Sequence, residues 1–336
     1  MREKRPSEQA ARPPRSSSAG VETSSGCGRA LGPECKEGGV ASLPAKLDRY
    51  GTARRRAREI MAYLDGESNG PPSSDPAAKA ASNLKHCGEY LLFRHYHTVD
   101  EVRLHAASFC RQHLVCPLCA VRRSSKQAGA YLQKFEAVTE QEPALRPVFI
   151  TYTVKNGRNL AERMDHLRNA LRKLTAARRQ ARKRGSGVTT WRHIAGAVGA
   201  LEATYDPKTG WHPHMHMVAL CDGWMDQGAM SREWKSVTGD SFVVGISALD
   251  REKPASEAFL ETFKYAVKFS DLTPALTWEA AKVLKGQRLV FSLGNMRGVE
   301  VPEHLTDEPL DGLPFFERMY RYLGGGHYGL SWHTTE

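Results

Sequence analysis

The 336-residue sequence lacks any long apolar run, and its first 40 residues contain almost no large apolar side chains. No stretch approaches the ~18 consecutive apolar residues of a membrane span. The N-terminus also has no apolar core of the kind that marks a signal peptide. We therefore expect a cytoplasmic protein without a membrane partner, in which cysteines serve as metal ligands more often than as disulfides.

Acidic residues are fewer than basic ones. The chain has 48 Lys and Arg against 37 Asp and Glu, a net charge of +11 and a pI near 9.3. This balance favours a polyanionic partner such as nucleic acid, although charge can also serve solubility alone. A length of 336 residues is enough for one large domain or two smaller ones, and a hydrophobic content of 40% suits a soluble globular core.

Composition divides the chain into four parts. The composition of residues 1–80 predicts a disordered basic tail with a possible helix at 43–64. Residues 81–140 form a cysteine-rich module, residues 146–300 a main domain, and residues 301–336 a C-terminal extension whose Gly324–Gly326 run suggests a flexible end. The order strand, helix, hairpin, helix, strand, helix indicates an α+β fold with helices packed on an antiparallel sheet.

Three histidines alternate along the segment from Trp211 to Leu220. In a strand, alternate side chains point to the same face, so His212, His214 and His216 share one face. Same-face neighbours lie ~6.5–7 Å apart, and at that spacing two imidazoles can converge on one divalent ion. Hydrogen-bonded core histidines are the alternative.

A predicted hairpin supplies a carboxylate to the same face. The segment 199–205 precedes Asp206-Pro207-Lys208-Thr209-Gly210, a strong turn signal. If Tyr205 pairs with Trp211, Glu202 lies opposite His214. A register shifted by one residue would place Ala203 there instead.

Four cysteines lie at spacings typical of a metal site. Cys116 and Cys119 form a CxxC pair, Cys110 lies six residues earlier, and Cys87 lies further back. Four thiolates suit a tetrahedral structural Zn²⁺. A redox CxxC is the competing interpretation, and the histidines that would replace Cys87 as fourth ligand are His95, His97 and His113. Cys27 and Cys35, in the tail, are expected to be free thiols.

A basic run follows the CxxC pair. Arg122-Arg123-Ser124-Ser125-Lys126 opens a predicted helix that extends to about Val138. Because it starts beside the cysteine module, this basic helix start would suit a phosphate backbone.

A further predicted helix, from Glu257 to Phe269, places polar residues opposite its apolar side. Glu261 and Tyr265 are four residues apart and therefore neighbours on the helix surface. A tyrosine beside a potential base and cations can be a nucleophile, with Glu261 accepting a proton and Lys264 or Lys268 stabilising negative charge. An ordinary exposed tyrosine with helix salt bridges is the alternative.

Taken together, these motifs resemble the rolling-circle plasmid replication initiators (Rep) of the HUH endonuclease superfamily. More narrowly, they resemble the single-tyrosine family with an N-terminal cysteine cluster. The resemblance spans roughly residues 84–300. It rests on Cys87-Gly88, on Phe109-Cys110 through Cys116-Pro117-Leu118-Cys119 to Arg122-Arg123, on Phe149 to Asn156, on Leu201-Glu202 with Trp211 to His216, and on Glu261 to Lys268; Arg288 to Gly298 resembles the family's closing strands.

The resemblance implies a role for each motif residue. His214 and His216 would be paired ligands of a catalytic Mg²⁺ or Mn²⁺, Tyr265 the nucleophile and Glu261 the general base. Glu202 as third ligand rests mainly on the hairpin register, and His212 would instead orient the site or bind phosphate. Superfamily members with two catalytic tyrosines place them three or four residues apart, whereas here position 261 is glutamate and 269 phenylalanine. The single-tyrosine scheme therefore fits.

The implied activity is nicking and rejoining of single-stranded DNA at a replication origin through a 5′-phosphotyrosyl intermediate. The expected partners are single-stranded and origin DNA, a host helicase and a host DNA polymerase. A relaxase or transposase of the same superfamily, or a non-catalytic zinc-dependent DNA-binding regulator, are the alternatives. The sequence predicts neither the oligomeric state nor the origin.

Overall fold

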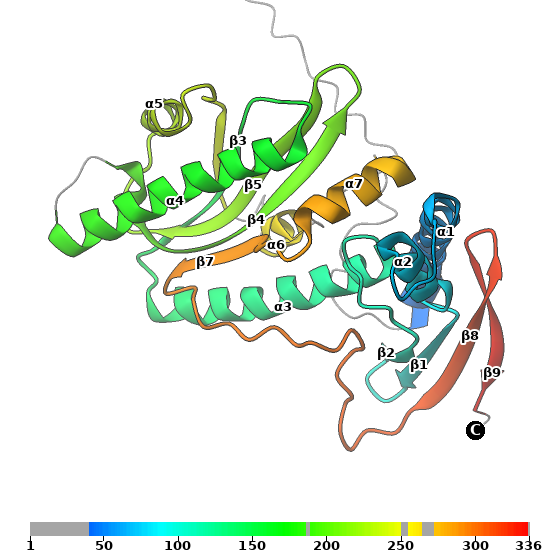
Figure 1. Cartoon of the computed structure of the whole chain (residues 1–336). Helices are drawn as coiled ribbons and strands as arrows, with labels where there is room; N and C mark the ends of the chain where they lie inside the picture. Colours follow the sequence, from blue (N-terminus) through cyan, green and yellow to red (C-terminus); the bar gives the residue numbers. More distant parts are fainter. Residues whose placement is uncertain (1–39, 186–188, 250–254, 264–271, 335–336) are drawn as a thin grey trace, which may run out of the picture.

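Two antiparallel sheets and the helices around them form the α+β fold that the sequence predicts (Figure 1). The structure, a computed structural model, describes residues 40–185, 189–249, 255–263 and 272–334. Within these ranges no helix has both the length and the apolar character needed to cross a membrane.

The larger sheet has five strands in the order β6-β3-β5-β4-β7, and every neighbouring pair is antiparallel. Its strands are β3 (Arg146–Thr153), β4 (Ile194–Asp206), β5 (Gly210–Cys221), β6 (Val244–Ala248) and β7 (Val290–Gly294). The central strand β5 carries the three histidines. The histidines therefore lie in the middle of the sheet, flanked by strands on both sides.

The β4–β5 hairpin has the predicted register. Tyr205 pairs with Trp211, and Glu202 pairs with His214. The turn is fixed locally, because Oδ1 of Asp206 accepts hydrogen bonds from the backbone N–H groups of Lys208, at 2.9 Å, and Thr209, at 2.8 Å. These bonds hold the loop at one length, and so Glu202 rather than Ala203 lies opposite His214.

Helices cover both faces of this sheet. On the face of Met215 and Met217 lie α4 (Leu160–Arg184) and α5 (Gln227–Thr238); Met164 and Trp234 are buried in the same core. On the histidine face, α3 (Pro117–Gln141) and α6 (Ala255–Thr262) cover the end of the sheet that carries Val218 and Leu220. The histidines lie beside this second core.

Local sequence explains where α4 begins and ends. The Asn159 side chain accepts a hydrogen bond from the N–H of Glu162, which satisfies one of the unpaired donors of the first turn. Gly185 ends the helix with a φ of 67°, a left-handed conformation that glycine adopts without strain. The helix therefore runs from the Asn159 cap to a basic last turn that contains Arg182, Lys183 and Arg184.

The smaller sheet has four strands in the order β2-β1-β8-β9. They are β1 (Tyr90–Tyr96), β2 (Glu101–Ala107), β8 (Phe316–Gly324) and β9 (His327–His333), and they lie beside α1 (Leu43–Glu67) and α2 (Pro76–Lys85), with α7 (Pro274–Leu284) against α1 (Figure 1). The Gly324–Gly326 run is the tight turn between β8 and β9, with positive φ at all three residues. The glycines make a hairpin here, not the flexible end suggested by composition.

Described structure begins at Val40, inside the segment 1–80 expected to be a basic tail, and α1 (Leu43–Glu67) covers the possible helix at 43–64. Helix α1 is rich in arginine, yet Tyr50, Ile60 and Leu64 are fully buried in the main core. Its apolar residues are few but share one side of the helix, and that side packs on the rest of the chain. Composition averaged over the segment concealed this narrow apolar stripe.

Arg122, at the basic start of α3, is buried inside the molecule. Its Nε donates to the Leu305 carbonyl at 2.7 Å, its Nη1 donates to the Tyr50 hydroxyl at 2.9 Å, and its Nη2 pairs with Asp307. The side chain is 2% exposed. The prediction of a phosphate contact is therefore wrong for Arg122, which instead joins α1, α3 and the segment before β8.

Candidate active site

A carboxylate and two imidazoles converge on the histidine face of the larger sheet. One ligand atom from each of Glu202, His214 and His216 lies within 4.8 Å of the others. Oε2 of Glu202 is 3.3 Å from Nε2 of His214 and 3.7 Å from Nε2 of His216. Glu202 and His214 are buried, at 2% and 8% exposure. Two imidazole nitrogens and a carboxylate oxygen form a donor set that suits a divalent cation, so the residues present fit the expected ion.

Hydrogen bonds turn both imidazoles toward Glu202. Nδ1 of His214 lies 3.2 Å from the His212 carbonyl oxygen, and Nδ1 of His216 lies 3.0 Å from Oγ1 of Thr151. A carbonyl can only accept, so Nδ1 of His214 carries the proton and Nε2 keeps its lone pair for a metal ion. Thr151 is a positioning residue that sequence reasoning missed, since only the β3–β5 register places it opposite His216.

His212 lies beside this group rather than in it. Its ring centroid is 5.5 Å from that of His214, and its Nδ1 contacts Oδ1 of Asn156 in the loop after β3. The ligand group of the described residues contains Glu202, His214 and His216 without His212. That His212 orients the site or binds phosphate stays a prediction.

Helix α6 brings a second carboxylate to the group. Oε1 of Glu261 lies 4.0 Å from Nε2 of His216. Behind it, Phe259 and Phe263 pack on Phe135 and Tyr131 of α3, with ring centroids 5.3 Å apart in both pairs. This packing fixes α6 over the histidine face. Tyr265 and Lys268, like Lys264, lie outside the described residues.

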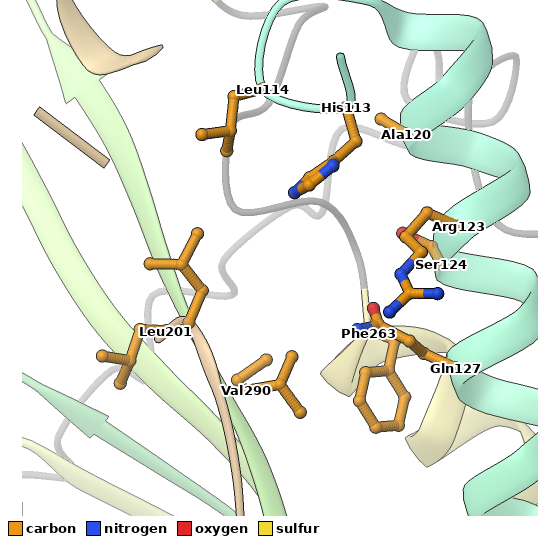
Figure 2. A pocket seen from close by; sticks show the side chains of 11 residues that line it. His113, Leu114, Ala120, Arg123, Ser124, Gln127, Leu201, Phe263 and Val290 are labelled. Atoms are coloured by element: carbon orange, nitrogen blue, oxygen red, sulfur yellow. The ribbon is translucent and has the colours of Figure 1, made fainter. Parts of the chain in front are cut away.

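A hollow lies next to the metal-ligand group, between α3 and strands β4 and β7 (Figure 2). Its volume is about 70 Å³. Its sheet side includes Ala200, which pairs with His216, and Val290, which pairs with Ala200. Figure 2 shows the His113 imidazole and the Arg123 guanidinium reaching into the space from the opposite side. A second hollow of about 250 Å³ shares His113 and Arg123 with the first.

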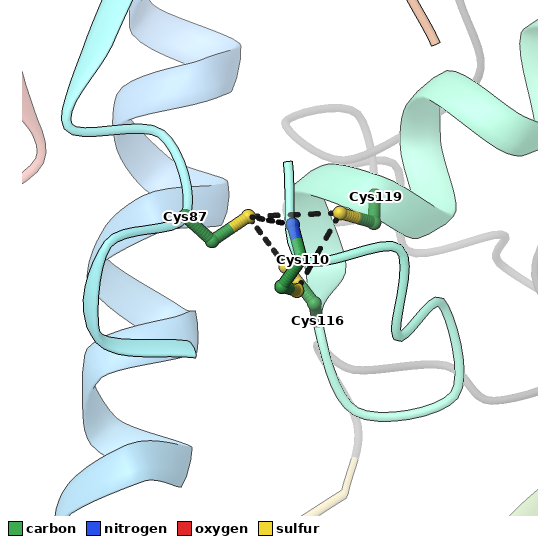
Figure 3. A group of neighbouring side chains, drawn as sticks. All are labelled: Cys87, Cys110, Cys116 and Cys119. Atoms are coloured by element: carbon green, nitrogen blue, oxygen red, sulfur yellow. Dashed lines mark hydrogen bonds between the residues drawn. The ribbon is translucent and has the colours of Figure 1, made fainter. Parts of the chain in front are cut away.

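The four predicted cysteines meet in one cluster (Figure 3). Sγ of Cys87 lies 3.4 Å from Sγ of Cys116 and 3.6 Å from Sγ of Cys119, and Sγ of Cys110 lies 3.6 Å from Sγ of Cys119. Four thiolates ~2.3 Å from a tetrahedral metal ion are about 3.8 Å apart, close to this arrangement. The cluster therefore fits a metal ion with Cys87 as its fourth ligand, whereas His95 pairs with Asp100 instead.

Electrostatics of the cluster favour at least one ionised sulfur. Hydrogen bonds from Cys116, Cys119 and Cys87 lower the pKa of the Cys110 thiol, whereas burial raises the pKa of Cys116. A bound cation would relieve the cost of the buried thiolates. Cys221 lies outside the cluster, where its thiol donates to Sδ of Met225.

The model of the Replication protein family matches residues 101–318. This chain belongs to that family. The match confirms the resemblance to plasmid rolling-circle replication initiators. It also covers both ligand groups except Cys87.

The chain is similar to several proteins named Protein rep. One from Lentilactobacillus hilgardii is 27% identical over 214 residues, which cover 58% of this chain and 63% of the relative. One from Lactiplantibacillus plantarum is 29% identical over 237 residues, covering 66% and 71%. One from Streptococcus pneumoniae is 27% identical over 197 residues, covering 54% and 58%. The match thus spans less than two thirds of the length of the first relative, and no solved structure matches the chain.

Proposed function

We propose that this Rep-family chain initiates rolling-circle replication by nicking and rejoining single-stranded origin DNA. The observation that carries the proposal is the meeting of Glu261 with the Glu202–His214–His216 group. Glu261 lies four residues before Tyr265 in the sequence. The metal ligands and the helix that leads to the proposed nucleophile thus come together at one place.

The chain's own groups account for the bond changes. Tyr265 attacks the scissile phosphorus, the bond to the 3′ oxygen breaks, and that oxygen takes a proton to leave a free 3′-OH. The phenolic proton passes to a base, for which Glu261 is the candidate. The cation held by His214, His216 and Glu202 would supply polarisation of the phosphate when bound. Lys268 is proposed to stabilise developing negative charge.

The second half of the cycle needs a base for water or for a strand end. Glu261, as a carboxylate, takes the proton from a water that attacks the phosphotyrosyl phosphorus. The bond between phosphorus and the Tyr265 oxygen breaks, the DNA keeps a 5′ phosphate, and the phenolate takes up a proton. A second tyrosine would instead favour repeated strand transfer, and position 261 does not offer one. Between the two halves, a host helicase would unwind the duplex and a host DNA polymerase would extend the 3′-OH.

The cysteine cluster is proposed to hold a structural Zn²⁺. It joins the turn after α2, which carries Cys87, to the loop after β2 and the start of α3, which begin 23 residues further on at Cys110. A site closed by four protein ligands leaves no position for substrate, which is typical of structural rather than catalytic zinc.

The test is covalent capture of DNA. The protein is incubated with Mn²⁺ and a library of origin-hairpin oligonucleotides, and adducts are resolved on denaturing gels. The adduct should vanish in Tyr265→Phe and persist in Tyr205→Phe, whose half-buried ring packs on Trp211. DNA binding without any adduct across the library would instead support a non-catalytic DNA-binding regulator.

A further inference from the structure

The two hollows meet at the cysteine module and together form one cleft, of which the smaller hollow reaches the larger sheet and the larger hollow lies against the segment with Glu303 and Leu305. They share His113 and Arg123, and the larger one also touches Arg111 and the metal-ligating Cys119. We call this space the Arg111–Arg123 cleft. It lies between the two ligand groups, with Cys119 at one end and Ala200, the pairing partner of His216, at the other.

We propose that the Arg111–Arg123 cleft holds unpaired nucleotides that flank the scissile phosphate. The two arginines bind the phosphate backbone, and the smaller hollow takes a base. The inference rests on the proposed function, because it assigns the cleft to the substrate of that site. The cysteine module then binds DNA itself in addition to bracing the fold.

The smaller hollow has the chemistry of a base pocket. Its polar lining consists of His113, Arg123, Ser124 and Gln127 from one side, and its apolar lining includes Leu114, Phe263 and Val290. Apolar walls hold a flat ring, and side-chain donors and acceptors read its edge. The volume of the smaller hollow is about 70 Å³. Because a cavity needs about 10–15 Å³ to hold one water molecule, this hollow has room for several.

The larger hollow has the chemistry of a phosphate site. Arg111 and Arg123 supply two positive charges against the one carboxylate of Glu303. Nη1 of Arg123 donates to the Pro302 carbonyl at 2.9 Å, which holds the guanidinium in place. Since a guanidinium carries five N–H donors, this one bond leaves donors for a phosphate.

The backbone at Arg111 gives a separate reason to assign a role to its side chain. Arg111 follows the ligand Cys110 and has a φ of 58°, a left-handed conformation that glycine adopts more readily than arginine. The fold alone would favour glycine at this position. An exposed arginine there is explained by what its side chain binds.

The sheet offers a continuous path from the cleft across the metal-ligand group. In register, Val290, Ala200, His216, Thr151 and Gly245 form one row across strands β7, β4, β5, β3 and β6. At the far end a Cβ added to Gly245 would meet only Thr151, at 3.8 Å. A single strand entering at the cleft can therefore cross His216 and leave over small residues.

The test measures DNA binding without chemistry. Fluorescein-labelled dT20 and a 20-base-pair duplex are titrated with protein in buffer lacking divalent cations and chelator, at several salt concentrations. The variants are Arg111→Gly and Arg123→Gln. The control is Arg232→Gln on α5, whose side chain is 78% exposed and lies on the helix layer of the opposite face.

Each cleft variant should lose about one phosphate contact. The slope of log K against log salt should fall by about 0.7, which corresponds to about fivefold weaker dT20 binding at 0.1 M salt. Glu303→Gln should strengthen binding, and Arg232→Gln should leave it unchanged. Arg111→Gly should melt no lower than the parent, because glycine relaxes the backbone there; its loss of affinity then reflects the side chain and not misfolding.

Two results would overturn the inference: parental dT20 affinity and salt slope in both arginine variants, or an equal loss for dT20 and duplex, which would make the cleft a duplex-binding groove. The assay separates this inference from the proposed function. If no Tyr265-dependent adduct forms but the two arginine variants bind dT20 more weakly, the nickase proposal fails and the cleft proposal stands. A normal adduct with unchanged binding in Arg111→Gly and Arg123→Gln removes the cleft and leaves the nickase.

Discussion

Nε2 of His216 lies 4.0 Å from Oε1 of Glu261, although the two residues belong to different elements, a central strand and a helix packed over it. This contact places the Glu261 carboxylate beside the Glu202–His214–His216 group. The two carboxylates of the site differ in their exposure to solvent. Glu202 is buried between the imidazoles, whereas the Glu261 side chain is 37% exposed and open to water.

Glu261→Gln should slow both halves of the reaction. The amide cannot accept a proton, so formation of the phosphotyrosyl adduct and its hydrolysis should each slow by about 10²–10⁴-fold, the usual contribution of a general base. On gels the adduct should appear more slowly than with the parent and, once formed, persist longer. Glu257→Gln, an exposed carboxylate one turn earlier on α6, is the matched control. Equal turnover in the two variants would remove Glu261 from the mechanism.

Glu202→Gln should weaken binding of Mn²⁺. The substitution removes the only negative charge among the three ligands while it keeps the size of the side chain. Outer-shell partners of metal ligands already contribute about 10–100-fold to affinity, so loss of a direct ligand should cost at least about 10-fold. Isothermal titration calorimetry measures it, with the exposed Glu162→Gln as control. Parental affinity in Glu202→Gln would mean that the carboxylate is not a ligand.

Cys87→Ser should release zinc and destabilise the protein. Structural zinc contributes about 10–16 kcal/mol in isolated zinc-binding peptides, so even partial loss lowers the free energy of unfolding measurably. Elemental analysis should give one zinc per parent chain and less than one in the variant, whose melting temperature should fall. Cys221→Ala, at a buried cysteine outside the cluster, should keep its zinc. Full zinc content in Cys87→Ser would return the fourth ligand to one of the histidines.

Asp307→Asn should destabilise the fold without affecting either ligand group. Burial raises the pKa of the Asp307 carboxyl, but the Arg122 charge together with hydrogen bonds from Arg122 and from the Leu104 N–H outweighs burial, and the net pKa is lowered. Breaking a buried ion pair by removing one partner costs about 3–5 kcal/mol. Urea denaturation measures this loss, and Asp311→Asn, an exposed aspartate in the same segment, should cost nearly nothing. A loss below 1 kcal/mol would show that Arg122 does not need its partner.

Asp240 should make stability depend on pH between about 4 and 2. Burial raises its pKa, but hydrogen bonds from Ser241, Arg163 and His166 outweigh burial and lower the pKa from 3.8 to about 2. Because the folded-state pKa lies below the unfolded one, the stabilisation is complete above the unfolded pKa and is lost as pH falls through the folded pKa.

The size of the Asp240 effect is limited by solvent, because the side chain is 34% exposed. We expect about 1 kcal/mol, below what the pKa shift alone would give. The difference in unfolding free energy between parent and Asp240→Asn should therefore be present at pH 6 and nearly absent at pH 2. A difference that is constant over this range would assign the effect to packing.

Local patterns determined much of the site. The alternation of His212, His214 and His216 in a strand fixes their common face, since side chains of a strand alternate. The register of Glu202 follows from a turn whose hydrogen bonds lie within five residues, around Asp206. The CxxC spacing likewise brought Cys116 and Cys119 together, because one turn at the start of α3 separates them.

Only the tertiary structure decided which distant segments meet. β8 pairs with β1 across more than 200 residues, for example Phe316 with His95, and nothing in the composition of residues 301–336 indicated it. Two arginines adjacent in sequence also have different surroundings. Arg122 is buried against Asp307, whereas Arg123 lines the cleft.

By itself, then, the sequence determined the α+β class, the metal-binding residue types and their local spacing, because these follow from strand and helix periods and from short-range hydrogen bonds. The approach of Glu261 to His216, the choice of Cys87 over the histidines and the Arg111–Arg123 cleft came from packing. Each of these depends on contacts between elements far apart in the chain, and a residue pattern does not record which buried surface will meet which.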